Sequence, residues 1–170
     1  SLEAGVKYLI LGALSTGFLV YGIAWIYGAM GTTDITLYNS ILESGAYHLN
    51  YLLFGIALIL LALGFKVGAV PMQLWIADVY QGAPTPITAF LSVASKAAGF
   101  LVLMTILSPF LAADATSSTV SSILLIMAGA TLLYGNLAAI SQNNFKRLLA
   151  YSSIAHAGFL LIGVATQDYN

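Results

Sequence analysis

The chain has 170 residues, of which 60% are apolar and only 6% are charged, with five Lys and Arg side chains against six Asp and Glu. Soluble domains carry roughly 25% charged residues, so this composition excludes an ordinary soluble domain and a disordered chain. A nucleic-acid-binding protein needs a basic face, which a formal net charge of -1 does not provide. The absence of cysteine excludes disulfides and thiolate metal sites. We therefore predict an integral membrane protein.

Stretches without charge predict where the chain crosses the membrane, because a helix needs about 20 residues to span a hydrocarbon core of about 30 Å. Four such stretches lie between Lys7 and Asp34, Glu43 and Lys66, Asp114 and Lys146, and Arg147 and Asp168. The apolar composition of the segment 66–114 favours a helix that carries Lys96 inside the membrane over a segment that does not span it. We therefore predict an all-α, multi-pass bundle of about five transmembrane helices.

The first helix is expected over residues 8–29, ended by Gly31 and the threonines that follow it. Small residues four apart let membrane helices approach each other closely. Such pairs are Ala13/Gly17 and Ala24/Gly28 in this helix and Gly135/Ala139 later in the chain. A polar loop is expected over 34–48.

The second helix is expected to begin near Asn50 and to break near Pro71, about one turn after Lys66. Proline lacks the N–H that would bond the Val67 carbonyl, and its ring clashes with that carbonyl. A short helical continuation is expected over 71–79. Backbone carbonyls freed at such a break can hold water, which a membrane protein tolerates only where the backbone is buried or lines a wet cavity.

The last three helices are expected over 86–108, 120–140 and about 145–165. Thr85 is a favourable cap for the third helix, and Pro86 suits its first position. Lys96 lies about ten residues into that helix, which is about 15 Å along its axis and half the membrane. The segment 109–119 is expected to be a loop.

Five crossings place the N-terminus, the turn after Asp78 and the Lys146-Arg147 connection on one side of the membrane. The basic residues outside the membrane, including Lys7, all fall on that side, which the positive-inside rule predicts to be cytoplasmic. The chain begins without Met and stops soon after a helix, so we expect a fragment of a larger subunit.

Lys66 and Lys96 carry the functional hypothesis, because both are expected near the middle of the membrane. A lysine at the centre of a transmembrane helix costs about 2.5–3.5 kcal/mol. One interpretation is that each pairs with a carboxylate on a neighbouring helix and fixes the packing. The other, which we favour, is a proton or ion path, because an amine that has lost its hydration releases its proton more readily.

His156 is a third candidate, a possible relay, because histidine titrates near neutral pH and can pass protons through water. The alternative is a packing histidine whose ring is satisfied by a backbone or hydroxyl group. Polar residues that could line the same hydrated route are Ser95, Asn136, Ser152 and Ser153. The chain has no Gly-rich phosphate loop and no cluster of histidines, so we expect no nucleotide, flavin, haem or metal site in it.

Several longer motifs stand out, beginning with Gly64–Pro86, which holds Lys66, Pro71 and a closing Gly-Ala-Pro-Thr-Pro. The others are Ser1–Tyr8, Phe90–Lys96, Gly135–Ala139 and Lys146–Gly158. Together they resemble successive helices of the antiporter-like membrane subunits of respiratory complex I, and the resemblance covers essentially the whole chain.

The resemblance implies a fourteen-helix subunit built from two inverted five-helix repeats. Residues 1–110 would then end the first repeat, and residues 118–170 would begin the second. Lys66 would be the family's lysine of the broken helix and Lys96 its relay lysine, whereas the acidic partner and the second-repeat lysine would lie outside this chain. Gln73 and Ala77 depart from the family pattern, which usually has His and Pro there.

The resemblance also implies a function: a proton-translocating membrane subunit of a NADH-quinone oxidoreductase in the bacterial inner membrane. Flavin, iron-sulfur clusters and quinone would be held elsewhere in the complex, and the partners would be its other membrane subunits and the lipid bilayer. Two alternatives stay open. One is a subunit of a multi-subunit cation/proton antiporter, which shares the fold and the lysines, and the other is a structural membrane spacer with paired lysines.

Overall fold

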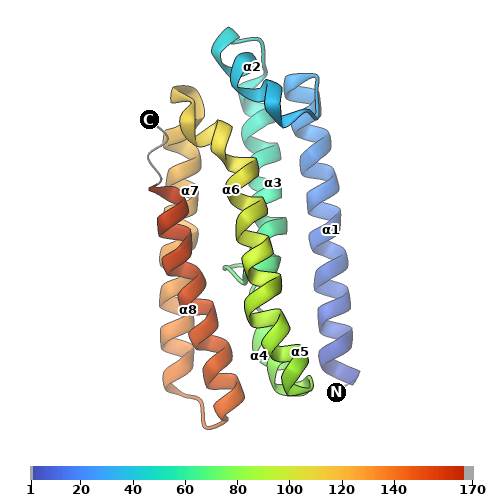
Figure 1. The fold of residues 1–170 in the computed structure, drawn as a ribbon, viewed down its shortest axis with the longest axis vertical. Helices are drawn as coiled ribbons and strands as arrows, with labels where there is room; N and C mark the ends of the chain where they lie inside the picture. Colours follow the sequence, from blue (N-terminus) through green and yellow to red (C-terminus); the bar gives the residue numbers. More distant parts are fainter. Residues whose placement is uncertain (1, 167–170) are drawn as a thin grey trace.

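The computed structural model describes residues 2–166, and long helices dominate this part of the chain (Figure 1). The elements are α1 (Leu2–Met30), η1 (Ile35–Leu37), α2 (Tyr38–Ser44), α3 (Leu49–Val67), α4 (Trp75–Gly82), α5 (Thr85–Phe90), the π-helical turn η2 (Leu91–Ser95), α6 (Lys96–Ala112), α7 (Asp114–Ile140) and α8 (Phe145–Ala165). Five spans are long and apolar enough to cross a membrane: Leu2–Met30, Leu49–Val67, Thr85–Ala112, Asp114–Ile140 and Phe145–Ala165. The predicted all-α bundle with five crossings is confirmed.

The connection between α1 and α3 is more ordered than the polar loop expected over 34–48. It contains η1 and α2, which lie at the end of the bundle opposite the N-terminal end of α1 (Figure 1). The Asp34 carboxylate starts η1 by accepting hydrogen bonds from the backbone N–H of Thr36 at 3.0 Å and from its hydroxyl at 2.6 Å. Such capping by Asp replaces the bonds that the first N–H groups of a helix lack.

Helices α1 and α3 pack through a glycine pair that the small-residue spacing did not identify. A Cβ added at Gly22 would lie 2.9 Å from the carbonyl oxygen of Gly55, and one added at Gly55 would lie 3.0 Å from that of Gly22. By contrast, a Cβ at Gly17 or Gly28 would meet nothing within 4 Å. The prediction for these two glycines was therefore wrong among the described residues, because α3 approaches a different face of α1.

The broken helix is present, but glycine rather than proline ends its first half. Helix α3 stops at Val67 because Gly68 adopts φ 79, and its N–H bonds the Gly64 carbonyl at 2.8 Å. The segment 68–74 then continues without helix near mid-height of the bundle (Figure 1), and α4 begins at Trp75 rather than at Pro71. The predicted break near Pro71 is confirmed, although it is longer and starts earlier than expected.

Side chains satisfy backbone groups around the break. The indole N–H of Trp75 donates to the Phe65 carbonyl at 3.0 Å, and the Thr131 hydroxyl of α7 accepts from the Val70 N–H at 3.0 Å. A buried backbone group without a partner is costly in hydrocarbon, so these two bonds hold the segment 68–74 between α3 and α7.

Two predicted boundaries on either side of α6 shift. Pro84 takes the cap position expected of Thr85, and its carbonyl accepts from the N–H groups of Ile87 and Thr88, both at 3.0 Å. No loop occupies 109–119, because α6 continues through Pro109 to Ala112 and α7 starts at Asp114. The helix tolerates Pro109 because the Thr105 carbonyl, which would lose its partner, accepts the Ser108 hydroxyl at 3.1 Å.

Helices α7 and α8 form a tight antiparallel pair. A Cβ at Gly135 would lie 2.7 Å from the Ala155 nitrogen, and one at Gly158 would lie 3.1 Å from the Ala128 carbonyl oxygen. Their connection lies at the same end of the bundle as the start of α1 and the turn between α4 and α5 (Figure 1). The topology expected from the five crossings is thus the one observed.

Candidate functional site

Lys66 lies in the last turn of α3, directly before the break. Its side chain is exposed on the described part of the chain, and its Nζ lies 6.0 Å from the centroid of the Phe65 ring. Within residues 2–166, no carboxylate forms an ion pair with Lys66. The chain itself therefore leaves this ammonium group available at the point where the helix is interrupted.

Lys96 is buried, with 7% of its surface exposed. Its ammonium group donates to two atoms of Ser153 on α8, the hydroxyl oxygen at 2.6 Å and the carbonyl oxygen at 2.7 Å. None of the ion pairs between described residues involves Lys96. A charged amine is thus held by neutral oxygens alone, an arrangement that stabilises a bound proton less than a carboxylate would.

The π-helical turn η2 (Leu91–Ser95) comes directly before Lys96. Such a turn holds an extra residue and is often found at functional sites. It changes the direction in which the following side chains leave the helix. This turn was not predicted, because a π-helical turn has no propensity signal of its own.

The elements that carry the two lysines are in contact. A Cβ at Gly99 of α6 would lie 3.1 Å from the Lys66 Cβ, and a Cβ at Gly68 would lie 3.9 Å from the Lys96 Nζ. The glycines therefore allow the end of α3 to approach the start of α6. The two ammonium groups have different surroundings, since one is exposed and the other is buried against α8.

A cavity of about 1130 Å³ lies between the α5–α6 segment and α8. Most of its wall is apolar, and its polar lining includes Tyr80, Thr88, Lys96, Lys146, Ser152, Ser153 and His156. The predicted candidates Lys96 and His156 therefore share one cavity, together with two of the predicted serines. The His156 side chain is exposed on the described part of the chain.

Two other predicted polar residues lie elsewhere. Asn136 is exposed, and its amide donates to the Leu132 carbonyl of its own helix at 2.9 Å. Neither Asn136 nor Ser95 lines the cavity. Gln73 is 4% exposed, and its Oε1 has no hydrogen-bond partner among the described residues.

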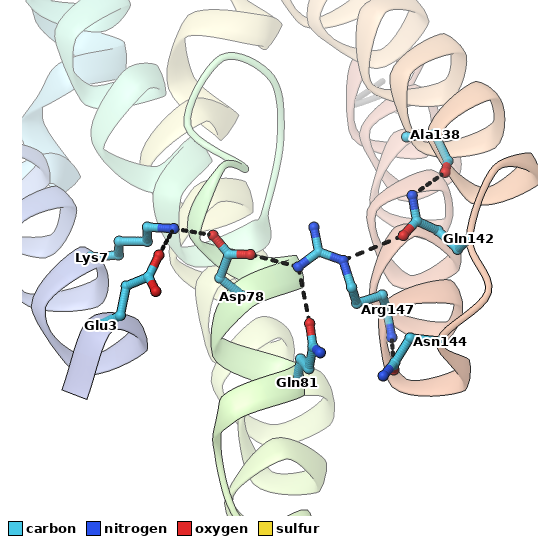
Figure 2. Close-up of polar contacts among 8 residues, drawn as sticks. All are labelled: Glu3, Lys7, Asp78, Gln81, Ala138, Gln142, Asn144 and Arg147. Carbon is cyan, nitrogen blue, oxygen red and sulfur yellow. Dashed lines mark hydrogen bonds and ion pairs between the residues drawn. The ribbon is translucent and has the colours of Figure 1, made fainter. Parts of the chain in front are cut away.

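Glu3, Lys7, Asp78 and Arg147 form a charged cluster that connects α1, α4 and α8 (Figure 2). Lys7 contacts Glu3 and Asp78, both at 2.7 Å, and Arg147 contacts the other Asp78 oxygen at 2.6 Å. Asp78 of α4 thereby joins α1 to α8.

The charged cluster was not predicted, although the sequence contained the information needed to expect it. The expected topology had already placed Lys7, Asp78 and Arg147 on one side of the membrane. Asp78 lies outside the five spans, and hydrogen bonds from Lys7 and then Arg147 hold the pKa of its carboxyl below the usual range. Arg147 also donates to the side-chain oxygens of Gln81 at 3.1 Å and Gln142 at 3.3 Å.

Within the described range 2–166, no group of three His, Asp or Glu side chains is arranged to hold a metal ion. The polar groups of the cavity are amines, hydroxyls and one imidazole. Such groups can hold and pass protons through hydrogen bonds.

Comparison with known proteins decides the family. The sequence model of the family described as "NADH:quinone oxidoreductase/Mrp antiporter, TM" matches residues 1–170. The chain belongs to this family. The likeness implied by the motifs around Lys66 and Lys146 is thereby confirmed, and membership agrees with the five spans of a multi-pass membrane protein.

Two relatives of the chain are subunits N of bacterial NADH-quinone oxidoreductases. NADH-quinone oxidoreductase subunit N of Chlorobium chlorochromatii is 45% identical over 99% of this chain, and that of Trichlorobacter lovleyi is 48% identical over 98%. Each alignment covers 34% of the relative. The chain thus spans about a third of the length of the curated relatives it matches.

Chains of several solved membrane complexes have the same fold as this chain. A chain of respiratory complex I from Thermus thermophilus matches with a TM-score of 0.80 and 37% identity, covering 96% of this chain and 34% of that one. A chain of an archaeal membrane-bound sulfane sulfur reductase matches with a TM-score of 0.84 and 32% identity, covering 96% and 33%. A chain of the Mrp complex from Dietzia sp. matches with a TM-score of 0.80 and 25% identity, covering 96% and 29%.

Proposed function

We propose that this chain is the proton-translocating part of subunit N of a NADH-quinone oxidoreductase in the bacterial inner membrane. Redox chemistry in partner subunits, which would hold flavin, iron-sulfur clusters and quinone, would change the charge near Lys66. A proton would then move between Lys66 and Lys96 through ordered water, with His156 as a further relay in the same cavity. The other membrane subunits of the complex would be its partners.

The observation that carries this proposal is the buried Lys96 ammonium group, held by Ser153 without a carboxylate among the described residues. A permanent ion pair would fix its proton, whereas hydroxyl and carbonyl oxygens allow it to be released and regained. The break beside Lys66 supports the same interpretation, because interrupted helices at membrane depth are tolerated where they are buried or line a cavity.

The predicted division into repeats belongs to this proposal. Residues 1–110 would complete one five-helix repeat, and residues 118–170 would begin the next. The boundary would then fall within 111–117, which holds the end of α6, the single connecting residue Ala113 and the first turn of α7. Residues 1 and 167–170 of these predicted repeats lie outside the described residues.

The test is to replace Lys66 with Ala in the assembled complex and to measure proton transport into membrane vesicles during NADH oxidation. Proton transport should be abolished or severely reduced, because the amine next to the break can no longer hold a proton. Glu43→Gln is the control, since it removes a charge from α2, at the opposite end of the bundle (Figure 1), where Glu43 forms no ion pair within residues 2–166. Both rates are normalised to assembled complex. A Lys66→Ala complex that assembles and pumps like the unchanged one would refute the proposal.

The second candidate is a subunit of a multi-subunit cation/proton antiporter. The match to a chain of the Mrp complex from Dietzia sp. favours keeping it, because its TM-score equals that for complex I. Purification from native membranes separates the two: an NADH- or quinone-reactive partner supports the oxidoreductase, and sodium-dependent exchange without redox partners supports the antiporter. A structural spacer with paired lysines finds no support in residues 2–166, where neither lysine is paired.

A further inference from the structure

Tyr80 of α4 carries a buried hydroxyl group whose hydrogen-bonding capacity is unused among the described residues. The residue is 2% exposed, and its hydroxyl group is buried without a hydrogen-bond partner among the described residues. Buried hydroxyl groups nearly always have a partner, either in the protein or in an ordered water molecule. Two other side chains share this property, Trp25 and Gln73, but only Tyr80 lines the cavity that contains Lys96.

The position of the Tyr80 hydroxyl links it to Lys96. The Ser153 hydroxyl accepts a hydrogen bond from the Lys96 ammonium group at 2.6 Å. The same side chain lies close enough to interact with the Tyr80 hydroxyl, although no well-formed hydrogen bond joins Ser153 to Tyr80. Both residues line the same cavity. A water molecule that bridges them would satisfy Tyr80 and extend the hydrogen bonds of Lys96 from α8 to α4.

The geometry points to Tyr80 as a hydroxyl member of the Lys96 proton path, joined to Ser153 by an internal water molecule. The inference rests on the proposed function, because it requires Lys96 to exchange a proton. In the transfer, the Lys96 N–H bond breaks as Ser153 or the bridging water takes the proton. Tyr80 then accepts a proton from that water and gives its own to the next water in the cavity. After the transfer, Ser153 and Tyr80 are neutral and Lys96 is a neutral amine. A second proton, arriving from the direction of Lys66, then protonates Lys96 again.

Contacts of α4 with neighbouring elements fix the position of Tyr80. Tyr80 stands two residues after Asp78, which binds Lys7 and Arg147 at the end of the bundle. The Tyr80 carbonyl accepts the Thr88 hydroxyl at 3.2 Å, so α5 also fixes its position. The cavity lining continues from Tyr80 to Thr88, Thr85 and Lys146. The proton given up by Lys96 would therefore leave toward the end that holds the charged cluster.

The experiment measures proton transport per assembled complex in vesicles for Tyr80→Phe, Ser153→Ala and the double variant. Phe keeps the buried ring of Tyr80 and removes only the hydroxyl group. The initial rate of proton transport in Tyr80→Phe should fall about fivefold, the loss expected when one ordinary hydrogen bond is removed from the rate-limiting step. Because both residues act on one path, the double variant should be no slower than the slower single variant.

The control variant is Tyr38→Phe, which removes a tyrosine hydroxyl from α2 at the opposite end of the bundle and should pump like the unchanged complex. A Tyr80→Phe complex that pumps at the unchanged rate, or losses that multiply in the double variant, would overturn the inference. Lys96→Met separates this failure from that of the proposed function. If Lys96→Met stops pumping and Tyr80→Phe does not, only the role of Tyr80 is refuted, whereas normal pumping by Lys96→Met refutes both.

Discussion

Asp78 is the residue through which α4 is attached to its neighbours. Its two carboxylate oxygens bind different cations, Lys7 of α1 and Arg147 of α8. Because α4 follows a segment of seven residues without helix, these contacts help to fix the half-helix that carries Tyr80 (Figure 2). Asp78 thus helps to hold the half-helix that follows the break beside Lys66.

Asp78→Asn should lower the free energy of unfolding of the detergent-solubilised protein by about 1–2 kcal/mol, since two partly exposed ion pairs are lost. Glu43→Gln is the matched control, because Glu43 is exposed and forms no ion pair within residues 2–166. The effect should depend on pH. Since Lys7 and Arg147 lower the pKa of the folded Asp78 carboxyl, its stabilisation is complete above the unfolded value of about 3.9 and is lost as the pH falls through the lower folded value.

The difference in unfolding temperature between Asp78→Asn and the unchanged protein should therefore stay constant at neutral pH and shrink below about pH 4. Thermal unfolding measured over this pH range checks the prediction. A difference that is the same in acid as at neutral pH would show that the ion pairs contribute nothing.

At the scale of helices, the close approach of α1 to α3 depends on Gly22 and Gly55 rather than on the pairs that the spacing suggested. Gly22→Val should destabilise the protein by about 3 kcal/mol, because its side chain would overlap the Gly55 carbonyl oxygen and Ile59. Gly17→Val, on the same helix with open space around it, should change stability little. Equal thermal unfolding curves for the two variants would contradict the observed packing.

The sequence predicted which segments are helices but not which faces meet. Charge-free stretches located four of the five spans and apolar composition located the fifth, which carries Lys96, because membrane thickness requires long apolar helices whatever their partners are. The choice of Gly22 over Gly17 depends on where α3 lies, which a single helix does not encode. The end of α3 at Gly68 was missed because proline is the stronger breaker in isolation, whereas here the left-handed conformation of Gly68 acts first.

At the scale of the whole molecule, the charged cluster and the break beside Lys66 lie at different heights along the bundle. The charged cluster lies at one end with the N-terminal end of α1 and the α7–α8 connection, and the break beside Lys66 lies near mid-height of the bundle (Figure 1). Residue types alone indicated Lys66, Lys96 and His156 as candidates, because ionisable groups at membrane depth are rare. Their surroundings, including Ser153 and Tyr80, depend on how α4, α6 and α8 pack, so only the structure could supply them.

The most direct test of the central claim is the number of protons transported per NADH oxidised by a complex that carries Lys96→Met. Methionine fills a similar volume but cannot bind a proton. Proton transport should be lost from the assembled complex, whereas Glu43→Gln, which removes an exposed charge outside the cavity, should retain it. If the Lys96→Met complex transports as many protons per NADH as the unchanged complex, the buried ammonium group does not carry them and the account is wrong.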